Sequence, residues 1–295
     1  MAHNKLEWLS YELRIPIPVL LELAENAERH YHQFEKRFAN GKLRLIEAPD
    51  EDLATALLQI RRVLLDPIPF SPIVHGCVKE RSPLTHAAVH VKTSNVASVD
   101  IKDFFPSVTN KMVYRVLLDR VNVGPDLARI LTRVTTRRGH LPQGATTSPA
   151  LANLVLGPVD REVERIAADL KVTAGRYVDN YDFAGVRARE AIGPAIVELQ
   201  RAGFAVRHKK TFNAGPTSPH VVTGYTVNSS NASISRVSRD NVRLKVYGLI
   251  AAHERGGDVE QLQRSIRGHL VHLSLTNPGF VTRMRRQLAS AGIVI

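Results

Sequence analysis

Apolar residues recur at three- and four-residue spacing along much of the chain, which is typical of helices that bury one face. On this spacing, helices are predicted at residues 6–13, 17–29, 52–65, 107–121, 148–170 and 192–202, and through most of the chain from 238 onward. Residues 42–49 instead alternate as K-L-R-L-I-E-A-P, which predicts a strand. Short apolar runs predict further strands at 96–101, 172–178, 181–185 and 221–227. The mixture indicates an α+β fold.

Length and composition narrow the class of protein. The 295 residues, 44% of them hydrophobic, are enough for one large globular domain or two to three subdomains. The longest apolar runs fall short of the ~18 residues of a membrane span. Residues 1–7 are too polar for a signal peptide, so a cytoplasmic protein without a membrane partner is predicted. The single cysteine, Cys77, excludes an internal disulfide framework and a cysteine-based zinc site.

The positive charge is concentrated near the C-terminus. The net charge is +12, and residues 201–295 hold fourteen Lys or Arg against four Asp or Glu, which accounts for ten of the twelve charges. A basic surface of this size suits a phosphate backbone, although a solvated face with a high isoelectric point would have the same composition.

Two aspartates stand at predicted strand ends. Asp100 closes the run at 96–101, within S-V-D-I-K-D-F-F-P-S-V, and Asp179 lies in a predicted hairpin turn, within R-Y-V-D-N-Y-D-F-A-G. An aspartate at such a position often only caps a helix or a turn. Two-metal phosphoryl transfer, however, requires carboxylates that converge from separate segments. Mg²⁺ favours one or two carboxylates together with substrate phosphates.

The residues around these aspartates resemble the motifs of reverse transcriptases. Asp100, followed five residues later by Phe105, resembles motif A. L-P-Q-G-A-T-T-S-P-A-L-A-N-L at 141–154 resembles motif B, Y-V-D-N at 177–180 resembles the Tyr-x-Asp-Asp box, and G-F-A-V-R-H-K-K-T at 203–211 resembles motif D. N-A-E-R-H at 26–30 and V-T-G at 222–224 resemble the N-A-x-x-H and V-T-G sequences of retron enzymes. The resemblance is therefore to retron-type (bacterial) reverse transcriptases, over about residues 26–278.

This resemblance implies a right-hand polymerase fold with fingers, a palm and a helical thumb. The expected division is N-terminal helices and fingers at 1–95, palm with part of the fingers at 96–235, and thumb at 236–295.

The resemblance also implies roles at the site. Asp100, Ile101 and Asp179 would hold two Mg²⁺ ions, or Mn²⁺ in their place, and Ile101 would also contact the nucleotide. Phe105 would sit beneath the incoming sugar and exclude ribose, unless it is simply a core residue. Gln143 and Gly144 would lie near nucleotide and template. Arg44, with Lys42 as a weaker candidate, would contact the triphosphate. Lys210, or its neighbour Lys209, would act as a general acid toward pyrophosphate, unless both only form a solvated face.

RNA contacts are expected at the retron sequences and in the basic tail. The candidates are Asn26, His30, Thr223, Gly224, Arg243, Arg264 and Arg267. The arginines would follow the phosphates of an RNA–DNA hybrid, and shape would supply much of the specificity for RNA.

The box departs from the family pattern at its last position, where Asn180 replaces a second aspartate. An amide is neutral and a poorer ligand of Mg²⁺ than a carboxylate. Asn180 can be natural and tolerated, engineered to trap a complex, or the mark of an inactive protein. Asp182 is on the same strand face but is expected one residue pair too far along the hairpin to replace it.

The resemblance predicts an RNA-directed DNA polymerase that uses dNTPs to copy a cognate non-coding RNA of the msr–msd type into branched msDNA. The expected setting is bacterial defence against phage, with any effector protein on a separate chain. The alternatives are a catalytically impaired scaffold that binds RNA or RNA–DNA, and a reverse transcriptase of another lineage.

Overall fold

The structure, a computed structural model, describes residues 5–38, 41, 43–207, 212–214 and 218–295. Its α-helices are α1 (Leu6–Leu13), α2 (Ile17–Asn26), α3 (Glu51–Ile60), α4 (Pro83–Ala88), α5 (Phe104–Ser107), α6 (Asn110–Asp119), α7 (Pro125–Thr135), α8 (Ser148–Leu170), α9 (Ile192–Arg201), α10 (Arg236–Glu254), α11 (Glu260–Ser274) and α12 (Pro278–Ser290). Three short turns of helix are η1 (Ala27–His30), η2 (Arg61–Leu65) and η3 (Ala188–Ala191).

Within the described residues, the strands form three antiparallel sheets. Strands β1 (Tyr31–Arg37) and β2 (Leu43–Pro49) make a two-stranded ribbon. The central sheet has the order β4-β5-β3-β6, from β3 (Val96–Asp100), β4 (Thr173–Tyr177), β5 (Asn180–Ala184) and β6 (Phe212–Ala214). Strands β7 (Val221–Val222), β8 (Tyr225–Thr226) and β9 (Ser233–Ile234) form a small third sheet.

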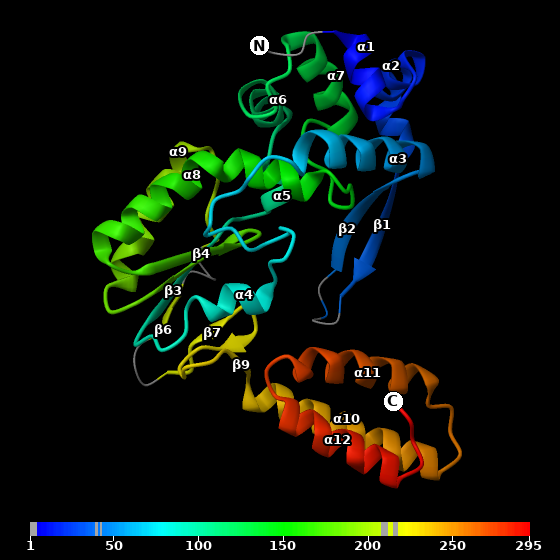
Figure 1. Cartoon of the computed structure of the whole chain (residues 1–295), viewed down its shortest axis with the longest axis vertical. Helices are drawn as coiled ribbons and strands as arrows, with labels where there is room; N and C mark the ends of the chain where they lie inside the picture. The colour runs from blue at the N-terminus through cyan, green and yellow to red at the C-terminus, as the bar shows by residue number, and fades with distance from the viewer. Residues whose placement is uncertain (1–4, 39–40, 42, 208–211, 215–217) are drawn as a thin grey trace.

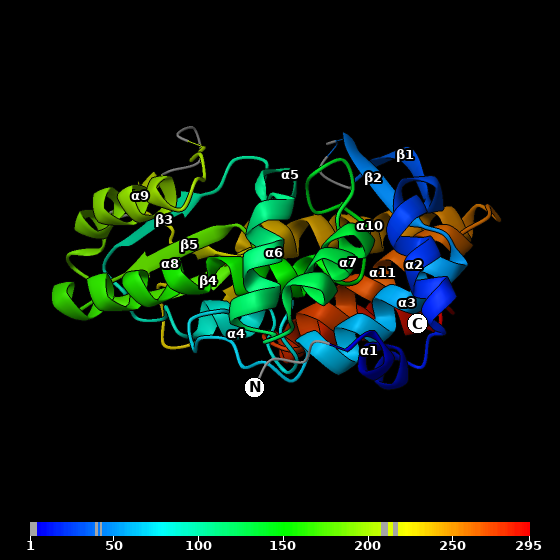
Figure 2. The same ribbon diagram turned by 90° about the horizontal axis from the view of Figure 1, so that it is seen from above.

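The central sheet is covered differently on its two faces. Helices α8 and α9 lie above it in Figure 1, and α4 lies below it. Figure 2 shows the N-terminal helices α1–α3 at one end of the molecule and the sheet with α8 and α9 at the other. One hydrophobic core joins these N-terminal helices to the sheet and to α8 and α9. This continuous core fixes the sheet relative to the β1–β2 ribbon.

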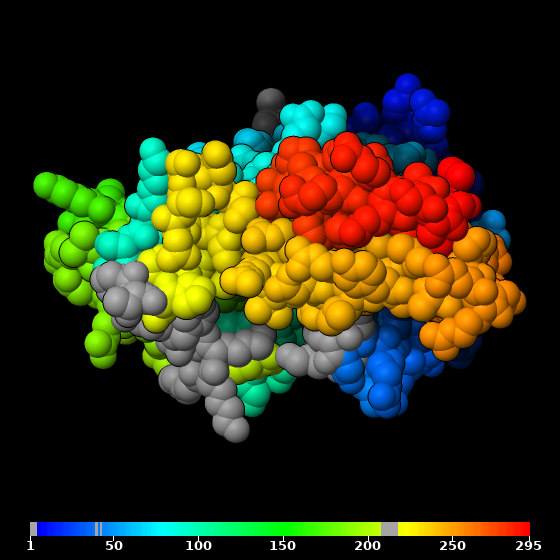
Figure 3. Space-filling model, turned by 90° about the horizontal axis from the view of Figure 1, so that it is seen from below, coloured from blue at the N-terminus to red at the C-terminus, as the bar shows by residue number. Residues whose placement is uncertain are grey.

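The last three helices pack on one another around a second core. Val246, Ile266 and Met284 are buried between α10, α11 and α12, and Tyr225 and Ala87 join the same cluster from β8 and α4. Figure 3 shows α10 (gold to orange) alongside α12 (red), with the β7–β9 segment (yellow) at one end and the β1–β2 ribbon (blue) near the other. Strands, ribbon and helical bundle together form the right-hand polymerase fold that was predicted.

Most elements predicted from periodicity are present, and two need correction. The helix expected at 107–121 is α6, which begins only at Asn110, because Thr109 has an extended conformation and caps α6 with its side chain; the short helix α5 ends at Ser107. The strand expected at 221–227 is divided into β7 and β8 by a turn at Thr223 and Gly224, both with positive φ. Strands β1, β6 and β9 and helices α4 and α7 were not predicted.

None of the helices in the described part of the chain has both the length and the apolar character needed to cross a membrane.

Candidate active site

Strand register brings the two predicted aspartates together. Asp100 ends β3 and pairs across the sheet with Asn180, the first residue of β5. Asp179 lies directly before Asn180, in the turn that joins β4 to β5. The backbone N–H of Ile101 donates to the carbonyl oxygen of Asp179 at 2.8 Å. Two aspartates from separate segments therefore lie next to each other where β3 ends and β5 begins, and Ile101 links their backbones.

The turn that carries Asp179 is held by a buried arginine. Val178 has a φ of 59°, a left-handed conformation that is costly for a β-branched residue. The Arg176 guanidinium donates to the Val178 carbonyl oxygen at 2.9 Å and to both carboxylate oxygens of Asp160 on α8, at 2.7 and 2.8 Å. Both charged side chains are at most 1% exposed. The hairpin tip is therefore attached to the longest helix of the fold.

A cavity of about 540 Å³ opens beside Asp179. It is lined by residues from β2, α5, the loop before α8, the hairpin and the segment after α9: Leu43, Arg44, Asp103, Phe104, Phe105, Pro106, Gln143, Tyr177, Val178, Asp179 and Arg207. The predicted nucleotide-contacting residues Arg44, Phe105 and Gln143 thus share one cavity with Asp179, although they come from four different segments.

The Pro-Gln-Gly loop is pinned to strand β2. The Glu47 N–H donates to the Gln143 carbonyl oxygen at 3.0 Å. Gly144 has a φ of 153°, and a Cβ there would lie 2.5 Å from the Glu47 carbonyl oxygen. Only glycine permits this approach of the two backbones. The Glu47 side chain, which is 6% exposed, pairs with Arg137 at 2.7 Å.

Arg207 is a site residue that the sequence analysis did not single out. Its guanidinium lies 3.0 Å from Asp103 Oδ1 and 3.7 Å from Asp100 Oδ1, and its side chain is 35% exposed. Its backbone N–H donates to the Asp100 carbonyl oxygen at 2.8 Å. The only sequence signal was its place in the stretch that resembles motif D. Arg207 and Arg44 line the same cavity, where each offers a positive charge.

Asp182 lies inside the sheet and does not take the place of a second box aspartate. Its carboxylate is 2% exposed, accepts from the Ser98 hydroxyl, and accepts from the Asn180 side-chain amide at 2.6 Å. Burial raises the pKa of Asp182 to about 6, while the hydrogen bonds from Ser98 and Asn180 act in the opposite direction. The neighbouring His86 Nε2 is 3.8 Å away.

The N-A-x-x-H residues lie away from this cavity and make internal contacts. His30 Nδ1 is 2.7 Å from Asp50 Oδ2, and Asp50 caps α3 through the Leu53 N–H. Burial lowers the pKa of His30, but the hydrogen bonds to Asp50 and Glu22 outweigh it and raise the pKa overall. Asn26 donates to Glu22 at 3.3 Å. These contacts join η1 to α2 and α3.

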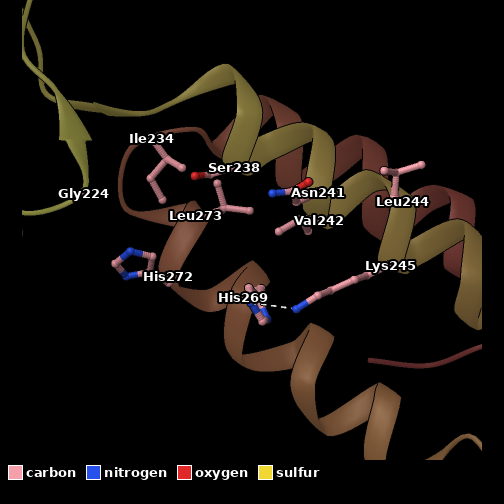
Figure 4. A pocket seen from close by; sticks show the side chains of 10 residues that line it. All are labelled: Gly224, Ile234, Ser238, Asn241, Val242, Leu244, Lys245, His269, His272 and Leu273. Carbon is pink, nitrogen blue, oxygen red and sulfur yellow. Dashed lines mark hydrogen bonds between the residues drawn. The ribbon is translucent and has the colours of Figure 1, made fainter. Parts of the chain in front are cut away.

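The V-T-G turn lies beside a second pocket, of about 490 Å³, between α10 and α11. Thr223 donates to the Pro83 carbonyl oxygen at 2.8 Å, which ties the turn to α4. Gly224 lines the pocket, and Figure 4 shows Lys245 and His269 pointing toward each other across it, with Nζ and Nε2 3.3 Å apart. The V-T-G turn and helices α10 and α11 thus line the same pocket.

The other predicted residues are placed as follows. Arg243 pairs with Asp240 at 2.6 Å and lies over the Phe280 ring. Arg264 forms an ion pair with Glu260 of the same helix, and Arg267 is exposed on α11. Lys42, Lys209 and Lys210 lie outside the described residues.

Curated relatives are similar along most of the chain. The retron Mx65 reverse transcriptase of Myxococcus xanthus is 33% identical over 285 residues, which cover 90% of this chain and 65% of the relative. The retron Ec86 reverse transcriptase of Escherichia coli is 27% identical, covering 88% and 82%. The retron Mx162 reverse transcriptase of Myxococcus xanthus is 28% identical, covering 94% and 62%. The chain thus spans less than two thirds of the length of the Myxococcus relatives. No family model matches the sequence.

Solved structures with a related arrangement include a foamy viral protease-reverse transcriptase in complex with double-stranded DNA. It is 16% identical with a TM-score of 0.40, and the match covers 72% of this chain and 32% of the viral one. Apo telomerase from Candida tropicalis is 11% identical with a TM-score of 0.45, and covers 75% and 61%.

The central sheet with its paired aspartates, the ribbon and the helical bundle make up a fold of the right-hand polymerase class. Within that class, the chain is similar to retron-type reverse transcriptases over most of its own length.

Proposed function

We propose that this protein is an RNA-directed DNA polymerase whose reaction takes place in the cavity beside Asp179. The observation that carries the proposal is the convergence of Asp179, Arg44, Phe105 and Gln143 on one cavity of about 540 Å³. Asp100 stands beside this cavity, paired with Asn180. A nucleoside triphosphate fits a cavity that offers positive charge at Arg44 and Arg207 and an aromatic ring at Phe105.

The donor set fits Mg²⁺. The residues that would hold the metal are two aspartates, Asp100 and Asp179, whose backbones are brought together by strand pairing and by the Ile101 N–H. This suits an ion that takes its other ligands from phosphate and water. When bound, the two ions would stabilise the attacking and leaving oxygens of phosphoryl transfer.

The chain's own residues would orient the substrate. Arg44 and Arg207 would bind phosphate oxygens by charge-assisted hydrogen bonds. Phe105, which is partly exposed in the cavity, would support the sugar and exclude a ribose 2′-OH. Gln143, whose carbonyl is fixed by Glu47, would support the base pair. Lys210 is retained as the candidate general acid from its place in the motif.

The first test is Mg²⁺-dependent incorporation of labelled deoxynucleotides on a primed RNA template. The unchanged protein should extend the primer, and Asp100→Ala should abolish extension. Asp169→Ala is the matched control, because Asp169 is an exposed aspartate of α8 whose ion pair is with Arg165. Extension that survives Asp100→Ala would contradict the proposed site. Absence of extension in the unchanged protein with RNA binding retained would favour the RNA-binding scaffold.

We propose further that the template is a cognate non-coding RNA of the msr–msd type and that the product is branched msDNA. Two observations support this proposal. The chain is similar to retron reverse transcriptases, and the bundle of helices α10–α12 carries Arg243, Arg264 and Arg267, which are partly or fully exposed to solvent. Thr223 and Gly224 lie next to that bundle, whereas Asn26 and His30 lie among the N-terminal helices. A role in defence against phage, with an effector on another chain, belongs to the same proposal.

The nucleic acid that copurifies with the protein tests this second step. A small structured RNA with covalently attached DNA is the expected result. Recovery of RNA without attached DNA, from a protein that is active on a primed template, would contradict msDNA synthesis.

A further inference from the structure

Asn180 and Asp182 occupy alternate positions of one strand and therefore point to the same face of the central sheet. Register places two rows of residues on this face. The outer row contains Asp100, Asn180 and Tyr177, and the inner row contains Ser98, Asp182 and Gly175. The outer row faces the site and the inner row faces α4. The Asn180–Asp182 contact therefore connects the candidate active site to the interior of the protein.

The chemistry of the contact fixes the orientation of the Asn180 amide. An ionised carboxylate can only accept hydrogen bonds, so the NH₂ group of Asn180 faces Asp182, where the Nδ2–Oδ2 distance is 2.6 Å. The carbonyl oxygen of the same amide consequently points away from Asp182. The other Asp182 oxygen is occupied by the Ser98 hydroxyl, which prevents the carboxylate from turning.

Asp182 lacks a cationic partner that would tolerate a second negative charge nearby. Among the described residues its only ion-pair contact is with His86, whose Nε2 is 3.8 Å away. No Lys or Arg side chain among the described residues lies within salt-bridge distance of Asp182. A carboxylate at position 180 would place two anionic oxygens at hydrogen-bond distance in a buried setting, where like charges repel strongly.

We propose that Asp182 is a positioning residue that holds the Asn180 amide in one orientation, and that the Asn-x-Asp arrangement at 180 and 182 is a functional unit. This inference rests on the proposed function, because it concerns how the polymerase site is supported. It accounts for Asn180 at the last position of the box: the carboxylate at 182 requires a donor at 180. Restoring aspartate at 180 alone therefore damages the site, although it recreates the Tyr-x-Asp-Asp pattern.

A double-mutant cycle tests the proposal with four full-length proteins: the unchanged chain, Asn180→Asp, Asp182→Asn, and the exchange Asn180→Asp with Asp182→Asn. Each is measured for kcat and KM of primer extension, for affinity toward an RNA–DNA duplex, and for melting temperature. Asn180→Asp is expected to lower kcat by roughly 10-fold or more and the melting temperature by about 5 °C. Asp182→Asn should lower kcat less, since an amide can still accept one hydrogen bond from Asn180.

The exchange is the decisive protein. It places a carboxylate at 180 opposite an amide at 182, so the hydrogen bond can form again in the opposite direction. Its kcat and melting temperature should recover to within about 3-fold and a few degrees of the unchanged protein. Duplex affinity should be the same in all four proteins, because the change is confined to the orientation of one side chain. A structural role alone would move the melting temperature and leave kcat unchanged.

Two further outcomes would overturn the inference. One is an Asn180→Asp protein as active and as stable as the unchanged chain. The other is an exchange protein whose losses equal the sum of the single changes. An insoluble Asn180→Asp protein leaves the exchange to decide, since recovery of folding supports the pair and its failure contradicts it. If no protein extends a primer, the proposed function fails, while the melting temperatures still report the coupling.

Discussion

The two faces of the central sheet handle buried charge in opposite ways. On the α8 side, Arg176 and Asp160 form a buried pair with two hydrogen bonds, and Tyr181 and Asn153 add further hydrogen bonds to it. On the α4 side, Asp182 is equally buried but has only neutral donors, Ser98 and Asn180, beside His86. The β4–β5 hairpin therefore has a buried ion pair on its α8 side and, on its α4 side, a buried carboxylate without a Lys or Arg partner among the described residues.

This difference separates stability from function within one sheet. On the α8 side, Arg176 holds the hairpin turn in place through the Val178 carbonyl oxygen. Substitution of either member of the Arg176–Asp160 pair is costly, because it leaves an unpaired charge in the interior. The α4 side leaves a carboxylate available to orient a side chain beside the site. The following predictions test this contrast, from the largest expected effect on stability to the smallest.

Removing the charge of Asp160 should have the largest effect. In Asp160→Asn the Arg176 guanidinium stays buried without a carboxylate, and the free energy of unfolding should fall by about 3–5 kcal/mol. Urea denaturation followed by circular dichroism measures this change. Asp169→Asn, an exposed aspartate on the same helix, should change stability by no more than about 1 kcal/mol. Equal effects of the two substitutions would remove the distinction between the faces.

On the α4 side of the sheet, Gly175 should not tolerate a methyl group. A Cβ there would lie 2.7 Å from both His86 Nε2 and His90 Nε2, so Gly175→Ala should destabilise the protein by about 1–3 kcal/mol through overpacking. Gly268→Ala is the control of opposite sign. That glycine is helical with nothing near its Cβ position, and alanine should stabilise α11 by about 0.5–1 kcal/mol. A neutral Gly175→Ala would show that the histidines can move away.

The buried histidines should make stability depend on pH. Burial, with the charge of His75, lowers the pKa of His90 to about 4. Between the unfolded pKa of about 6.5 and that value, the unfolded chain binds a proton that the folded chain does not. The free energy of unfolding should therefore fall by about 1.4 kcal/mol per pH unit from this histidine as pH decreases through the window.

The variant His90→Leu isolates this contribution. Its stability should fall less steeply between pH 6.5 and 4 than that of the unchanged protein, and melting temperatures across this range measure the difference. Asp182 has a raised pKa and so acts with the opposite sign, but it is present in both proteins and cancels in the comparison. Parallel pH curves would mean that the pKa of His90 is the same in the folded and the unfolded chain.

Substitution of Arg207 should have the smallest effect on stability but a measurable effect on the KM for dNTP. Its guanidinium is 35% exposed, so Arg207→Ala should alter the free energy of unfolding by no more than about 1 kcal/mol. Loss of one charge-assisted hydrogen bond to the triphosphate should raise the KM for dNTP by roughly 10-fold. Steady-state extension kinetics test this. Arg201→Ala, in which an exposed arginine of α9 is removed, should leave KM unchanged.

The elements that were predicted correctly have strong local signals. Helices α1 and α8 begin and end as their apolar period indicates, and β3 ends at Asp100 as expected. Asp179 was placed in the hairpin turn for the same reason. Strand β1 was missed because six of its seven residues are exposed, which leaves no alternation of burial to detect. The hairpin at Thr223 was missed because two-residue strands are too short for a period.

Sequence alone predicted the α+β class, the order of the motifs and the two candidate aspartates, because these depend on local pattern and on residue type. Tertiary structure decided which side chains meet. The contact of Asn180 with Asp182 depends on the pleat of β5 and on Ser98 from another strand. The approach of Arg207 to Asp100 depends on a chain return of about a hundred residues. Such contacts arise from register and packing between distant segments, which no local pattern of hydrophobic and polar residues specifies.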